Sequence, residues 1–170
     1  RSREVWDIGC NTGEFSLIAA ESAESVIALD RDHASIERLY RRLKQNGPRN
    51  ILPLVMDISD PSPSRGWNFS ERAELRSRGR PDLIFALALM HHLVISANIR
   101  MEMFIEFLAT FEADVIVEFV GAEDPMSKLL LQNKPEVHSG YTREEFERIL
   151  ETHFAVRETL MLPGGHRTLY

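Results

Sequence analysis

Short apolar runs alternate with amphipathic stretches along the whole chain. The apolar runs, rich in Val, Ile, Leu and Phe, predict strands over residues 4–8, 25–30, 51–57, 82–89 and 114–120. The stretches between and after them predict helices over residues 14–22, 32–46, 99–111, 124–133 and 142–154. In the second of these helices, one apolar face forms at i, i+3, i+4 and i+7 from Ile36, Leu39, Tyr40 and Leu43.

Two segments depart from this alternation. Residues 58–81 are polar and rich in Pro, Ser and Arg, which predicts a loop with one short helix. Residues 155–162 and 166–170 are strand-like and flank a Pro-Gly-Gly sequence, which predicts a closing antiparallel hairpin. Because the first strands are apolar on both faces and joined by helices, we expect an α/β fold, a three-layer αβα sandwich around a mostly parallel sheet.

Composition and charge limit the class of protein. With 170 residues, of which 44% are hydrophobic and 27% charged, the chain is expected to form one globular domain. Its net charge of −6 indicates neither a nucleic-acid partner nor a membrane surface. A single cysteine and the absence of a signal peptide or a membrane span of about 18 apolar residues favour the cytoplasm. The chain lacks an initiator methionine, so we expect a domain cut from a longer protein.

The segment VWDIGCNTGEF, residues 5–15, leads from the first predicted strand into the first predicted helix. Its glycines, Gly9 and Gly13, let the backbone turn sharply and approach a ligand closely. In a parallel sheet of this kind, ligands bind outside the carboxyl ends of the strands. Three further segments are expected at that edge: Asp30, residues 56–57 and residues 86–92. Asp30 follows the first glycine by about 20 residues, the spacing at which a carboxylate accepts hydrogen bonds from a ribose diol.

The glycine pattern and the charges around it distinguish between possible cofactors. A dinucleotide loop has the pattern G-x-G-x-x-G, and its middle glycine is missing here. Asp7 and Glu14 flank the turn and would repel a diphosphate, which disfavours an NAD-dependent oxidoreductase. The carboxylates suit S-adenosylmethionine instead, because it carries a sulfonium, an ammonium and a ribose diol but no phosphate.

At this point the chain resembles the class I S-adenosylmethionine-dependent methyltransferases, a family with a seven-stranded Rossmann-like sheet. The resemblance is carried by VWDIGCNTGEF, ALD, VMD and DLIFALALMHHL, at the spacing of the family's first four motifs, and it covers essentially the whole chain. The chain is also similar, through PSPSRGW, ALALMHHL and EFVGAEDPM, to bacterial methyltransferase-like proteins of unsettled substrate. It departs from the family in lacking the helices that usually precede the first strand.

The resemblance implies roles for the acids of the four segments. It assigns Asp7 to the methionine ammonium, Asp30 to the ribose and Asp57 to the adenine edge. The residues predicted to bind the cofactor are Asp7, Gly9, Cys10, Asn11, Gly13, Asp30, Arg31, Met56, Asp57, Ile58 and Ala86. Cys10 is expected to be buried beside the turn, and no Cys/His cluster has metal-ligand spacing.

Candidates for catalysis follow the fourth strand and end the fifth. His91 and His92 are candidate general bases, since imidazole titrates near neutral pH; the alternative is that they pack against or cap the next helix. Glu118 interrupts an apolar strand and could act as a base, orient an amine, or simply reach solvent. Trp67 and the arginines of residues 58–81 form either a surface lid over this opening or a site for an anionic or nucleic-acid substrate.

We therefore expect a methyltransferase acting on an acceptor of unknown class. The protein would position the acceptor against the sulfonium methyl, with proton removal secondary. The alternative is a catalytically inactive module that keeps the cofactor fold for assembly or regulation.

Overall fold

A seven-stranded sheet organises the chain in the computed structural model, which describes residues 2–132 and 140–170. The strand order is β3-β2-β1-β4-β5-β7-β6. The strands are β1 (Glu4–Ile8), β2 (Ser25–Asp30), β3 (Ile51–Val55), β4 (Leu83–Ala86), β5 (Asp114–Val120), β6 (Leu160–Met161) and β7 (Arg167–Leu169). β1 pairs in parallel with β2 and β4, β2 pairs in parallel with β3, and β7 is antiparallel to both β5 and β6. The prediction of a mostly parallel Rossmann-like sheet with an antiparallel closing hairpin is confirmed.

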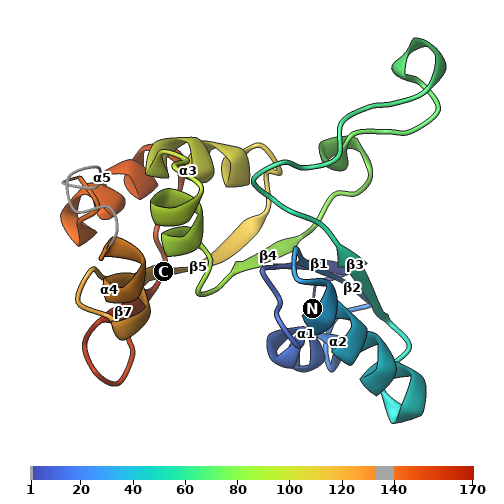
Figure 1. The fold of residues 1–170 in the computed structure, drawn as a ribbon, viewed down its shortest axis with the longest axis horizontal. Helices are drawn as coiled ribbons and strands as arrows, with labels where there is room; N and C mark the ends of the chain where they lie inside the picture. The colour runs from blue at the N-terminus through green and yellow to red at the C-terminus, as the bar shows by residue number, and fades with distance from the viewer. Residues whose placement is uncertain (1, 133–139) are drawn as a thin grey trace. The chain divides into compact units, whose positions relative to one another are not determined.

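The chain divides into two compact units, residues 1–85 and 86–170. In the first unit, α1 (Glu14–Ala20) and α2 (His33–Asn46) pack against β1, β2 and β3 (Figure 1). Asp32 caps α2 by accepting a hydrogen bond from the Ala34 N–H. The core of this unit is formed by buried apolar side chains of the sheet and both helices, among them Val5, Val26, Ile36 and Leu39. The expectation of a single domain stays a prediction.

β3 and the segment after it differ from the prediction. The strand ends at Val55 rather than at residue 57, and it contains Pro53, which is tolerated because β3 lies at the edge of the sheet. Residues 58–81 form two short 3₁₀ helices, Trp67–Phe69 and Leu75–Ser77, instead of one helix. Left-handed backbone at residues 68 and 69 keeps the first of them to a single turn. Figure 1 shows this segment, in green, extending away from β3.

The second unit contains α3 (Met101–Ala109), α4 (Pro125–Leu131), α5 (Arg143–His153) and a π-helix, His92–Ser96. α3 packs against α5, and the core includes Ile105, Leu108, Phe119 and Phe146. The helices that the sequence predicts are all present with slightly shorter bounds; the predicted end of one of them, Asn133, lies outside the described residues. Within the described part of the chain, no helix has the length and apolar character that crossing a membrane requires.

Candidate functional site

The turn after β1 is built from left-handed backbone. Gly9 and Gly13 both have φ 80°, and Asn11 between them has φ 49°. The N–H groups of Gly9 and Cys10 both donate to the Leu29 carbonyl, at 2.8 and 3.0 Å, and the Gly13 N–H donates to the Cys10 carbonyl at 2.8 Å. The turn is therefore fastened to the end of β2 and delivers the chain directly into α1.

Gly13 also allows α1 to approach α2 closely. A Cβ atom at this position would lie 2.6 Å from Leu39 Cδ1, and Leu39 is completely buried, so it has no room to move away. The second glycine of the motif is thus required twice, by the backbone conformation and by the packing of the two helices.

We expect Gly13→Ala to lower the free energy of unfolding by about 2–4 kcal/mol, since left-handed strain and overpacking add together. The matched control is Gly165→Ala in the closing hairpin, where φ is +73° but no atom lies within 4 Å. That variant should lose only the strain, about 1–2 kcal/mol. Urea unfolding of both variants measures the difference; equal losses would show that contact with Leu39 contributes nothing.

Asp30, the acid that ends β2, already organises the turn. Its Oδ2 accepts the Asn11 N–H and its Oδ1 accepts the Asp32 N–H, both at 2.8 Å. The Ser35 hydroxyl donates to Asp32 Oδ2 at 2.8 Å and also lies 3.2 Å from Asn11 Oδ1. Each carboxylate oxygen can accept more than one hydrogen bond, so Asp30 retains acceptor capacity for the hydroxyls of a diol while it holds the turn in place.

Asp7 lies beneath the turn, 2% exposed, in β1. The Ser16 hydroxyl donates to its Oδ2 at 2.5 Å. Burial raises the pKa of Asp7 to about 6, against the lowering effect of the Ser16 hydrogen bonds. Within residues 2–132 and 140–170, no Lys or Arg forms an ion pair with it. A buried carboxylate without a counter-charge is suited to binding a cationic group.

Cys10 and the acid after β3 complete the cofactor candidates in the first unit. Cys10 is buried, as predicted, and its burial raises the pKa of the thiol, which makes it a poor nucleophile. Asp57 Oδ1 accepts hydrogen bonds from the Ser59 hydroxyl and N–H, at 2.6 and 2.9 Å, and these lower its pKa, with a smaller contribution from Arg31. Met56 and Ile58 on either side of it are half-buried.

Glu14 does not contribute as the sequence suggested. It is exposed and forms an ion pair with Arg42 at 2.5 Å, so its negative charge is offset by a neighbouring cation. Repulsion of a diphosphate near the turn therefore rests on Asp7 and Asp30.

In the second unit, β4 ends at Ala86, which is fully buried, and the chain turns at Ala88 with φ 47°. The Ala88 N–H donates to Glu118 Oε2 at 2.7 Å, and Arg167 Nη1 lies 3.5 Å from Glu118 Oε1. Both oxygens of this buried, predicted catalytic acid thus have partners within the unit. Glu118 does not reach solvent at the strand end, which was the alternative for this residue, since it is 5% exposed.

The two histidines differ in their surroundings. His91 is 2% exposed, and burial together with the neighbouring His92 lowers its pKa to about 4. Its Nδ1 is buried without a hydrogen-bond partner among the described residues. His92 is half-buried, and the centroid of its ring lies 4.1 Å from that of the His91 ring. His92 is also the first residue of the π-helix, a rare element that is often found at functional sites. A neutral, buried His91 is a weak base near pH 7.

Sequence reasoning did not assign Asp124 or Arg167 to the site. Arg167 Nε donates to Asp124 Oδ2 at 2.7 Å, and the same guanidinium reaches Glu118. Asp124 was expected only as a helix cap, which it also is. Arg167 begins a three-residue strand between His166 and Thr168, and this local sequence carries no signal for its pairing with the two acids.

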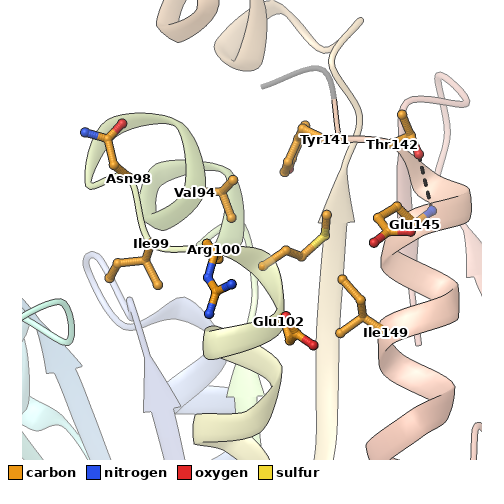
Figure 2. A pocket seen from close by; sticks show the side chains of 11 residues that line it. Val94, Asn98, Ile99, Arg100, Glu102, Tyr141, Thr142, Glu145 and Ile149 are labelled. Atoms are coloured by element: carbon orange, nitrogen blue, oxygen red, sulfur yellow. Dashed lines mark hydrogen bonds between the residues drawn. The ribbon is translucent and has the colours of Figure 1, made fainter. Parts of the chain in front are cut away.

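A pocket of about 470 Å³ opens in the second unit between the start of α3 and α5. Its buried base is apolar and is formed by Val94, Met101, Tyr141 and Ile149. Figure 2 shows Arg100 and Glu102 on the α3 side facing Glu145 on α5. Such a volume and lining suit a small molecule with an apolar body and polar groups. None of the predicted site residues is among those described as lining it.

Comparison of the sequence with known proteins identifies the family to which this chain belongs. Residues 5–108 match the model of the methyltransferase domain family. The chain is 36% identical over its full length to the nodulation protein NoeA of Rhizobium meliloti (strain 1021), of which it spans 36%.

Solved structures share the fold. The N-methyltransferase NodS from Bradyrhizobium japonicum WM9, in complex with S-adenosyl-L-homocysteine, is 17% identical with a TM-score of 0.66, over 99% of this chain and 75% of that one. The magnesium protoporphyrin IX methyltransferase ChlM from Synechocystis PCC 6803, also with bound S-adenosylhomocysteine, is 15% identical with a TM-score of 0.63, over 97% of this chain and 70% of ChlM. The matched family model covers the glycine turn, Asp30, Asp57 and the segment after β4. The chain therefore belongs to the S-adenosylmethionine-dependent methyltransferases.

Proposed function

We propose that this chain transfers a methyl group from S-adenosylmethionine to an acceptor and that its first unit holds the cofactor. The proposal rests on one observation: the left-handed turn after β1 lies next to two acids, one at the turn and one buried. Asp30 stands at the turn with acceptor capacity for a ribose diol, and Asp7 lies buried with no Lys or Arg ion pair among the residues that the structure describes. The ammonium of the cofactor would supply the counter-charge that Asp7 lacks.

The remaining predicted residues complete this site in the proposal. The turn residues Gly9, Cys10, Asn11 and Gly13 would face the cofactor with backbone groups. Arg31, Met56, Asp57 and Ile58 of the same unit would line the adenine and its surroundings. Ala86, at the end of β4, stays a predicted cofactor residue. S-adenosylmethionine supplies a methyl group on a positively charged sulfur, which is itself a good leaving group. The residues of the chain then need chiefly to orient the acceptor and exclude water.

The first expected outcome concerns the ligand. S-adenosylmethionine and S-adenosylhomocysteine should each raise the melting temperature and bind in calorimetry, because ligands that bind only the folded state stabilise it. NAD should do neither, since its diphosphate would meet Asp7 and Asp30. Binding of NAD without a response to either sulfur nucleoside would contradict the assignment.

A second measurement separates an enzyme from an inactive module with the same fold. Methyl-labelled S-adenosylmethionine would be incubated with a panel of amines, alcohols and thiols, and S-adenosylhomocysteine would be quantified. Amines are the first acceptors to test, because the structurally similar NodS is described as an N-methyltransferase. Cofactor binding with no transfer to any acceptor class would favour the module that binds but does not catalyse.

A further inference from the structure

Arg167 lies between two buried carboxylates of the second unit. Its Nε donates to Asp124 Oδ2 at 2.7 Å and its Nη2 to Asp124 Oδ1 at 3.3 Å, while Nη1 approaches Glu118 Oε1 at 3.5 Å. The side chains of Glu118 and Asp124 are 6% and 7% exposed, and that of Arg167 is 33% exposed. Because buried carboxylates are costly without a counter-charge, the planar guanidinium serves as the shared partner of both acids.

Each of the two acids in turn holds a backbone N–H group. Asp124 Oδ1 accepts the Met126 N–H at 2.9 Å and so caps α4, and Glu118 Oε2 accepts the Ala88 N–H at 2.7 Å. Ala88 has φ 47°, a left-handed conformation that is unfavourable for a residue other than glycine. The turn after β4 is thus stabilised by a carboxylate from β5, which is itself paired with a guanidinium from β7.

The same turn leads into the two histidines. The imidazole of His91 is close enough to the ion pair for its pKa to be lowered by Arg167 and raised by Asp124. His91 is buried and cannot shift alone, so a change in the backbone at Ala88 would displace the histidine and the start of the π-helix together.

We propose that Arg167 is a positioning residue for methyl transfer: it holds Glu118, and Glu118 holds the turn at Ala88 that presents residues 86–92. The inference rests on the proposed function, since the turn matters for catalysis only if this segment faces the reaction. It gives Glu118 a specific role, as an anchor for backbone rather than as the group that removes a proton.

We call the chain of contacts from Arg167 through Glu118 to the Ala88 N–H the relay. Amide hydrogen exchange at Ala88 tests it without requiring that the methyl-accepting substrate be known. In Arg167→Met, exchange of the Ala88 amide, measured by NMR, should become about tenfold faster than in the parent, as expected for a weakened hydrogen bond to a charged acceptor. Arg167→Lys should recover part of this protection, and millimolar methylguanidinium should recover part of it in Arg167→Met. Rescue of this kind would not follow from a general loss of packing.

The matched control is Arg143→Met. Arg143 has a similarly exposed side chain, 34%, and bridges Glu147 and Tyr170 in the same unit. Arg143→Met should lower the global free energy of unfolding without a specific acceleration of amide exchange at Ala88.

The relay is wrong if Arg167→Met leaves Ala88 exchange unchanged, or if the Arg143 variant accelerates it equally. Should Arg167→Met not fold, Arg167→Lys decides the question in the same way, with partial acceleration supporting the relay and none refuting it. S-adenosylhomocysteine binding to the parent, measured alongside by calorimetry, tests the proposed function separately. Its absence would overturn that function and leave the exchange result to be judged alone.

Discussion

Replacing Asp30 with Ala should weaken S-adenosylhomocysteine binding by about 100-fold or more. The carboxylate is proposed to accept two hydrogen bonds from the ribose, and hydrogen bonds to a charged group contribute about 1.5–3 kcal/mol each before water compensates. The structure adds a second reason for a large effect. Asp30 accepts the N–H groups of Asn11 and Asp32, so its removal also loosens the turn that would contact the rest of the cofactor.

A matched control separates binding from folding in this experiment. Asp82, in the same unit, also accepts two backbone N–H groups, those of Arg3 and Glu4, both at 2.8 Å. Asp82→Ala should lower the free energy of unfolding and leave ligand affinity unchanged, because Asp82 precedes β4 and is not at its carboxyl end. Calorimetry and urea unfolding of both variants give the comparison. An affinity for Asp30→Ala within about twofold of the parent would remove Asp30 from the site.

Local patterns account for the features that the sequence predicted well. The turn at residues 9–13 follows directly from an apolar strand, two glycines and an amphipathic helix that are neighbours in the chain. Asp30 and Asp57 end or follow apolar runs, and parallel strands bring such positions to one edge of the sheet. The positions of these residues at strand ends could be inferred in advance because they follow from the order of elements along the chain.

Long-range pairing accounts for what sequence reasoning missed. Arg167 meets Asp124 and Glu118 across 43 and 49 residues, and only the pairing of β7 with β5 brings them together. The strand predicted over residues 82–89 is too long for a related reason: its end depends on a bond from Ala88 to Glu118, 30 residues away. The ion pair of Glu14 with Arg42 likewise joins two helices. None of these contacts has a local signal of period or composition.

Asp7→Asn should have opposite effects on stability and on cofactor binding. In the ligand-free chain, burial holds the pKa of Asp7 near 6, above the ordinary 3.8, with Asp30 adding a smaller upward effect. The folded state therefore binds the proton more tightly than the unfolded state. The stabilisation that the protonated Asp7 side chain gives to the folded state is complete below about pH 4 and is lost as the pH rises through about 6.

At pH 7 the ionised, buried carboxylate then disfavours the fold by up to roughly 3 kcal/mol. Asn is neutral at every pH and keeps an oxygen to accept the Ser16 hydroxyl. The variant should accordingly be more stable than the parent at pH 7, and the fall in its unfolding free energy between pH 4 and pH 6 should be smaller. Urea unfolding across this range measures both differences.

Binding should respond in the other direction, because the proposed partner of Asp7 is the ammonium of the cofactor. Parent affinity for S-adenosylhomocysteine should decrease by up to about tenfold for each pH unit below 6, as Asp7 becomes protonated. Asp7→Asn should bind about 10- to 100-fold more weakly at pH 7 and show little dependence on pH. Adenosine has no ammonium, so its affinity provides the matched control and should be the same for both proteins. If S-adenosylhomocysteine and adenosine lose equal affinity in Asp7→Asn, Asp7 supports the turn and does not bind the methionine end.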